Sequence, residues 1–155
     1  MLTFSFKLFS QNKIAGYYED YFGNSIFLNS DSSFKYNWNF DLASSWSKGT
    51  WSYKNDTIYF HVTPVYDTLK LIKENNLFKD TLVLSQDENS GRLTQGQFIG
   101  VLLSGGGQNR KPSPDKLLFK KGRLYEIVNG KLLRKKRKGF WSNKKWYPWY
   151  FKSDG

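Results

Sequence analysis

Phe34-Lys-Tyr-Asn-Trp-Asn-Phe40 alternates aromatic and polar residues along its whole length. Side chains in a β-strand point alternately to opposite faces, so the four rings of this stretch would share one face of a sheet. Similar strand-like segments lie on both sides of it, at Ile26-Phe-Leu28, Gly49-Thr-Trp-Ser-Tyr53 and Thr57-Ile-Tyr-Phe-His-Val62. Together these segments predict an antiparallel sheet with one aromatic face.

Short polar turns separate the predicted strands. Asn29-Ser-Asp-Ser-Ser33 and Asn55-Asp56 are rich in residues whose side chains hydrogen-bond their own backbone in turns. Later in the chain, Lys120-Lys-Gly122 and Asn129-Gly130 join further strand-like segments, and Asn-Gly is the strongest short hairpin signal. These turns predict that successive strands pair with each other.

Three segments interrupt this pattern. Residues 86–97 are predicted as a polar loop, Phe98–Leu103 as a buried strand, and the glycine-rich segment 104–114 as a flexible loop. Counting every predicted strand, Phe98–Leu103 included, gives about eight to ten, which is the range of closed or nearly closed antiparallel folds. We therefore predict an all-β protein, an antiparallel up-and-down barrel or a strongly curved sandwich, in a single domain over residues 1–155.

The residue inventory restricts the chemistry. The chain has no cysteine, which excludes disulfides, thiolate metal sites and cysteine nucleophiles. Its one histidine, His61, would need an orienting carboxylate to act as a general base, and a histidine metal site needs several ligands. The run Gly105-Gly-Gly107 lacks the Gly-Lys-Ser/Thr ending of a phosphate-binding loop. We expect no metal, no cofactor and no catalysis, with an enzyme that uses His61 as a minor alternative.

The first ten residues allow two interpretations. Their composition is similar to the end of a secretion signal, near Ser10-Gln11. Their alternation of apolar with polar residues equally predicts an amphipathic first strand. A signal favours a secreted or periplasmic location. No apolar run approaches the roughly 18 residues that a transmembrane helix requires.

Positive charge is concentrated at the carboxy-terminal end. Residues 110–155 contain 15 Lys/Arg against 3 Asp/Glu, whereas residues 1–109 contain 9 against 10. Residues 139–155 are predicted as a basic aromatic tail. Cations and rings in alternation suit nucleic acid, an acidic polymer or a membrane surface. Such a partner would bind Arg134, Lys135, Lys136, Arg137, Lys138, Lys144, Lys145 and Trp146. Alternatively, the rings close one end of a barrel and the charge is incidental.

Three runs carry a family resemblance: Gly16-Tyr-Tyr18, then residues 27–36, then Gly49-Thr-Trp-Ser-Tyr53 with its continuation to Phe60. In this order and spacing they resemble small bacterial lipocalin-like proteins of the calycin type. The resemblance covers residues 14–62 and continues beyond them only as a pattern of strands. It implies an up-and-down antiparallel barrel that often holds a small apolar molecule in its mouth.

Two functional hypotheses follow. The first is a non-enzymatic lipocalin-like binding or accessory protein that holds a small hydrophobic ligand with Tyr36, Trp38, Trp51 and Tyr53. The same four rings would also fill a dry core, because side chains can pack an eight-stranded barrel solid. The second is a basic interaction module that docks on an anionic partner through its carboxy-terminal segment. The oligomeric state stays open.

Overall fold

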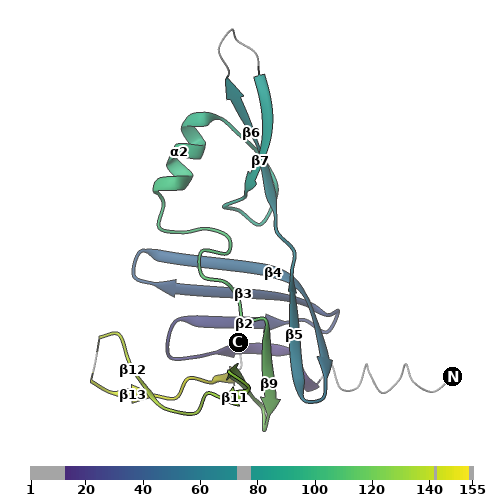
Figure 1. Ribbon diagram of the computed structural model, residues 1–155, viewed down its shortest axis with the longest axis vertical. Coiled ribbons are helices and arrows are strands. Elements are labelled where there is room, and N and C mark those ends of the chain that lie inside the picture. Colours follow the sequence, from purple (N-terminus) through teal and green to yellow (C-terminus); the bar gives the residue numbers. More distant parts are fainter. Residues whose placement is uncertain (1–12, 73–77, 142, 154–155) are drawn as a thin grey trace, which may run out of the picture.

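The computed structural model, which describes residues 13–72, 78–141 and 143–153, has a closed antiparallel β-barrel as its main body (Figure 1). The eight barrel strands are β1 (Gly16–Glu19), β2 (Asn24–Leu28), β3 (Ser33–Phe40), β4 (Ala43–Lys54), β5 (Thr57–Val62), β9 (Lys116–Lys120), β10 (Arg123–Val128) and β14 (Tyr150–Ser153). Their order is β10-β14-β1-β2-β3-β4-β5-β9, and β9 pairs with β10 to close the ring. The short β11 (Lys131–Leu132) follows β10 and pairs antiparallel with the end of it. The all-β prediction is confirmed, as a barrel and not a sandwich.

The predicted hairpin turns are present and have the backbone geometry that tight turns need. Asn55 and Asp56 both have positive φ, at 50° and 58°, and so do Asn129 and Gly130, at 50° and 72°. Two successive residues with positive φ make the turn whose twist matches that of the strands it joins. The turn chemistry of the sequence therefore sets the pairing of β4 with β5 and of β10 with β11.

The middle of the barrel is filled by a continuous hydrophobic core. Buried side chains alternate with more exposed ones along the strands, and every barrel strand contributes at least one. The core residues in the strands are Tyr18, Ile26, Leu28, Phe34, Tyr36, Trp51, Ile58, Phe60, Leu117, Leu124 and Tyr150. Each large apolar side chain buried here stabilises the fold by about 1.5–3 kcal/mol.

One end of the barrel is closed by its own chain. Ile14 precedes β1, is 2% exposed and belongs to the core cluster. The Tyr18 hydroxyl donates a hydrogen bond to the Ile14 carbonyl at 2.7 Å, and Trp51 Nε1 donates to the Asn29 carbonyl at 3.0 Å. Burial raises the pKa of Tyr18 to about 12. We call this the closed end and the opposite end the mouth.

A smaller unit projects from the barrel between β5 and β9 (Figure 1). It consists of β6 (Tyr66–Ile72), β7 (Phe78–Leu84), β8 (Arg92–Leu93) and the helix α2 (Gln95–Leu103). The predicted buried strand at Phe98–Leu103 is therefore wrong, because these residues are helical and none of the helix is buried. Thr94 and Gln97 form a capping box that starts the helix.

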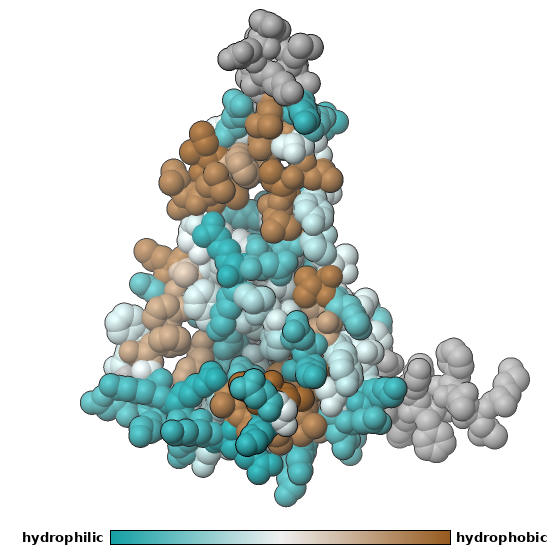
Figure 2. Space-filling model, in the orientation of Figure 1, coloured by the Kyte–Doolittle hydropathy of each residue, from teal (hydrophilic) through white to brown (hydrophobic). Residues whose placement is uncertain are grey.

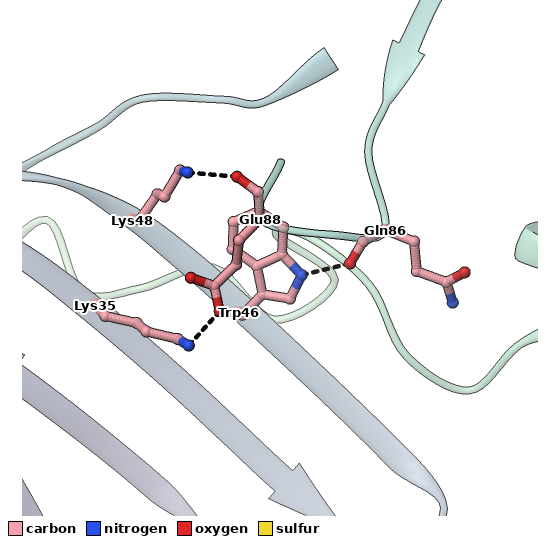
Figure 3. Close-up of polar contacts among 5 residues, drawn as sticks. All are labelled: Lys35, Trp46, Lys48, Gln86 and Glu88. Atoms are coloured by element: carbon pink, nitrogen blue, oxygen red, sulfur yellow. Dashed lines mark hydrogen bonds and ion pairs between the residues drawn. The ribbon is translucent and has the colours of Figure 1, made fainter. Parts of the chain in front are cut away.

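Polar contacts fasten the projecting unit to the outer face of the barrel (Figure 3). Trp46 Nε1 donates to the Gln86 carbonyl at 2.7 Å, and Lys48 Nζ donates to the Glu88 carbonyl at 2.5 Å. The Glu88 carboxylate also forms an ion pair with Lys35. These contacts hold the segment after β7 against β3 and β4.

Residues 105–109 run beside the first half of β4. Ser44 N donates to the Gly105 carbonyl at 3.1 Å, Trp46 N to the Gly107 carbonyl at 3.2 Å, and Asn109 N to the Trp46 carbonyl at 2.9 Å. β5 pairs only with the second half of β4, so the first half needs these partners for its backbone groups. The segment is a loop, as predicted, and its backbone is hydrogen-bonded to the barrel.

The carboxy-terminal residues also differ from the simple tail that the sequence predicted for 139–155. Tyr150–Ser153 form β14, which pairs with both β1 and β10 and so belongs to the barrel wall. The two short strands β12 (Arg137–Lys138) and β13 (Lys145–Trp146) pair into a separate hairpin. Residues 1–10, predicted as a signal remnant or a first strand, lie outside the described residues.

We predict that Trp51→Ala lowers the free energy of unfolding by about 3–5 kcal/mol, because it removes a fully buried ring and leaves a cavity. Trp141→Ala is the matched control: Trp141 is 84% exposed, so its loss should change stability by no more than about 0.5 kcal/mol. Urea unfolding of both variants measures the difference. Equal stability of the two variants would contradict the assigned core.

Candidate ligand site at the barrel mouth

The mouth of the barrel holds an open cavity of about 580 Å³. It lies where β1, β3 and β10 end and where β2, β9 and β14 begin. It is lined by the barrel strands, the turn between β1 and β2, the segment before β9, the β12–β13 hairpin and Pro148 before β14. A concave site with a few convergent polar groups is the usual form of a small-molecule site.

Asn24 is the centre of a hydrogen-bond network in this cavity and is 6% exposed. Its Nδ2 donates to Asp20 Oδ2 at 2.7 Å. Its Oδ1 accepts from the Tyr36 hydroxyl and from Lys111 Nζ, each at 2.7 Å. Asp20 Oδ1 also accepts from the backbone N–H groups of Phe22 and Asn24. The network therefore joins the turn between β1 and β2, the strands β2 and β3, and the segment before β9.

Lys111 reaches the mouth because its backbone is held on β4. Its N–H donates to Ser45 Oγ at 2.9 Å, and Ser45 Oγ donates back to the Lys111 carbonyl at 3.0 Å. The ammonium lies 4.8 Å from the centre of the Trp38 ring, which is within cation–π range. Burial lowers the pKa of Lys111, and the nearby charge of Asp20 opposes this shift.

A second pair of opposite charges lies across the cavity. Arg137 Nη2 is 3.7 Å from Glu126 Oε2. Burial raises the pKa of Glu126, although Arg137 acts to lower it. Burial likewise raises the pKa of Asp20 against the hydrogen bonds from Asn24. Two desolvated carboxylates and two cations thus line one cavity, an arrangement that can bind polar groups of either sign.

The buried tyrosines beneath these charges favour their neutral forms. Burial raises the pKa of Tyr36 and of Tyr150, and the charge of Asp20 acts in the same direction on both. Both hydroxyls therefore keep their protons across the physiological pH range. They form the polar floor of the mouth above the hydrocarbon core.

The structure separates the four rings that the sequence assigned to a ligand. Tyr36 lines the mouth cavity, and Trp38 lies beside it under Lys111. Trp51 is buried in the core, with its indole N–H bonded near the closed end. Tyr53 lies at the closed end, where its hydroxyl donates to Asp56 Oδ1 at 2.8 Å. All four share the inward side of the barrel, but only the first two lie near the mouth.

The predicted anion-binding residues come together around one hairpin. Arg134, Lys135 and Lys136 are exposed in the segment that enters it. Lys144 Nζ lies 4.0 Å from the centre of the Trp146 ring, which stacks at 4.2 Å on Tyr21. Within this set, Arg137 and Lys138 also line the mouth cavity. The basic segment therefore contributes both to the mouth and to the outer surface.

Sequence reasoning missed Asp20, Asn24, Lys111 and Glu126. One signal was available for Glu126, which shares the strand face of buried Leu124 in the run Leu124-Tyr-Glu-Ile-Val128. Asp20 and Asn24 lie only four positions apart, at the two ends of the polar turn between β1 and β2, so a local turn signal was available for them. Lys111 carries no local signal, because it meets Asn24 across 87 positions of sequence.

His61 is exposed on β5, opposite Thr50 in register, and is not among the residues that line the mouth. In the part of the chain that the structure describes, no cluster of three or more His, Cys, Asp or Glu side chains has a metal-binding arrangement. No helix in that part is long and apolar enough to cross a membrane.

No family model, curated protein or solved structure matches this chain. Its class is therefore defined by the fold and the site: a closed eight-stranded antiparallel barrel, consistent with a calycin-like fold, with a charged cavity at its mouth.

We predict that Asn24→Ala lowers the free energy of unfolding by about 1–3 kcal/mol, because it leaves the groups that bond Asn24 without their buried partner. Asn37→Ala, on the opposite face of β3, should change it by no more than about 0.5 kcal/mol. Chemical denaturation of both variants measures the effect. A neutral Asn24→Ala variant would show that the network does not stabilise the mouth.

We also predict a pH-dependent effect of Glu126→Gln. The raised pKa of Glu126 contributes stability that is complete below its unfolded value of about 4.3 and is lost as pH rises through the folded value. The wild type loses this stability as the carboxylate ionises, whereas the amide of the variant does not ionise. The free energy of unfolding of the variant, relative to that of the wild type, should therefore increase between about pH 4 and about pH 7. Urea unfolding at both pH values tests this, with exposed Asp87→Asn as the control. A pH-independent difference for Glu126→Gln would contradict the burial of a charged carboxylate.

Proposed function

We propose that this chain is a lipocalin-like, non-enzymatic binding protein that holds a small amphiphilic molecule at the barrel mouth. The observation that carries the proposal is the open cavity of about 580 Å³, whose charged lining residues include Asp20, Lys111, Glu126 and Arg137. Perturbed titratable groups that gather in a concave site are a physical indication of function. The closed antiparallel barrel is the second support.

The position of the cavity argues for a ligand with a polar end. The middle of the barrel is occupied by the core, so a ligand would lie in the mouth and not deep in the interior. There it would meet the rings of Phe22 and Phe140 together with Lys111 and Glu126. Asn24 and Arg137 compensate these charges only in part, and a purely hydrophobic ligand would remove their remaining water without replacing its hydrogen bonds. An amphiphile would satisfy both kinds of wall.

The function is tested with the fluorescent amphiphile 8-anilinonaphthalene-1-sulfonate as probe. We expect saturable one-site binding to the wild type. Lys111→Met should weaken it at least about tenfold, because a charge-assisted hydrogen bond to the sulfonate is lost. Fluorescence titration measures the affinities.

Two matched variants complete this experiment. Lys120→Met removes an exposed cation at the closed end and should bind as the wild type does. Leu42→Ser removes an exposed apolar side chain that does not line the mouth cavity and should also leave the affinity unchanged. Equal affinity of the wild type and Lys111→Met, with both folded by circular dichroism, would overturn the assignment of the ligand to the mouth.

A further inference from the structure

Three protruding parts of the molecule carry large apolar side chains that are more than four-fifths exposed. Leu42, in the turn between β3 and β4, is 89% exposed. Leu103, at the end of α2, is 82% exposed, and Trp141, near the tip of the β12–β13 hairpin, is 84% exposed. Single exposed apolar residues are common on protein surfaces, but contiguous ones mark interaction sites.

Direct contacts connect these three parts. Two residues after α2, the backbone of Gly105 lies so close to Leu42 that an added Cβ would come within 2.3 Å of the Leu42 carbonyl oxygen. The Phe40 ring, which ends β3 just before this turn, lies 4.1 Å from Phe140 and 5.9 Å from Trp141 between ring centres. We call the resulting row of exposed side chains the apolar strip: Leu42, Ile99, Leu102, Leu103, Phe140 and Trp141.

The apolar strip follows one side of the molecule. α2, the β3–β4 turn and the tip of the β12–β13 hairpin all lie along the left side in Figure 1. Figure 2 shows hydrophobic surface at the upper and middle left, and hydrophilic surface below it at the lower left. The strip therefore begins on the projecting unit and ends at the basic hairpin.

The basic hairpin supplies a high density of positive charge at that end. Residues 134–145 contain seven Lys/Arg and no Asp/Glu. Arg137 is directed to Glu126 in the mouth, whereas Lys135, Lys136, Lys138 and Lys145 are exposed. Exposed apolar side chains beside a run of cations with no acidic residue in the same segment match a surface with negative charge outside and hydrocarbon beneath.

We propose that the apolar strip and the basic hairpin dock this protein on an anionic lipid bilayer. The lysines would attract anionic headgroups, and the leucines would insert beneath them, with Trp141 at the headgroup level. Nucleic acid fits less well, because the exposed aliphatic side chains of the strip would gain nothing from a polyanion. This surface adjoins the mouth cavity, which Phe140 and Lys138 also line. Leu42, Leu103, Lys135 and Lys136 do not line the cavity, so the variants that test the bilayer do not depend on the proposed ligand.

The first experiment is co-sedimentation of the full chain with vesicles. We expect binding to mixed phosphatidylcholine and phosphatidylserine vesicles, with much weaker binding to phosphatidylcholine alone. Replacing Lys135 and Lys136 together by Gln should reduce affinity about fivefold per lysine. Replacing Leu42 and Leu103 together by Ser should reduce it at least about tenfold.

Matched controls separate this surface from general charge and hydrophobicity. Lys54→Gln with Lys120→Gln removes two exposed cations at the closed end. Leu82→Ser removes a side chain that is 66% exposed on β7, outside the strip. Both controls should bind vesicles as the wild type does. All substituted side chains are exposed, and circular dichroism verifies that each variant is folded.

The second experiment measures insertion directly. Brominated lipids should quench part of the tryptophan fluorescence of the wild type. Trp141→Leu should still bind the vesicles, because it keeps an apolar side chain, but should lose that part of the quenching. Quenching equal to that of the wild type would show that Trp141 does not enter the bilayer.

Three results would overturn the proposal: equal binding to neutral and anionic vesicles, no binding to either, or unchanged binding by the variant with both leucines replaced. An oligonucleotide and heparin serve as competing probes. Salt-sensitive binding to either of them, without vesicle binding, would assign the basic hairpin to an anionic polymer instead.

Discussion

β4 is twelve residues long, but β5 pairs only with its second half, from Gly49 to Lys54. The backbone groups along its first half must find other partners, since buried N–H and C=O groups are costly when unpaired. Residues 105–109 supply these partners, where the chain returns to the barrel after forming β6, β7, β8 and α2. Their return places Lys111 in the mouth and Gly105 against Leu42. Both the mouth site and the apolar strip depend on this difference in strand length.

The basic side chains after position 109 lie in two different environments, the mouth cavity and the surface of the hairpin. In the mouth, Lys111 and Arg137 lie with Asp20 and Glu126, as desolvated charges require compensation nearby. On the hairpin, the exposed lysines keep their hydration and need no such partner. The count of basic residues after position 109 does not distinguish these two environments. Lys111 is half-buried, whereas Arg137 and Lys138 are exposed on the hairpin and line the mouth cavity as well.

Much of the fold was predictable because its signals are local. Alternation along residues 34–40 and the turns at Asn55-Asp56 and Asn129-Gly130 lead directly to paired strands. The helix α2 was missed because a six-residue apolar run fits a strand as well as a helix. Its capping box, Thr94 with Gln97, was the local signal that could have found it. The run of glycines before Gln108 suggested mobility, but its backbone groups complete β4.

By itself, the sequence determined an all-β chain of paired strands with aromatic inward faces, because alternation and turn chemistry act between near neighbours. Of the residues that line the candidate site, it had singled out Tyr36, Arg137 and Lys138, but not the network that joins Asn24 to Lys111. Only the tertiary structure decided that Trp51 is core while Tyr36 lines a cavity. The physical reason is barrel closure, which sets the depth of each inward side chain and brings together charges from distant parts of the chain.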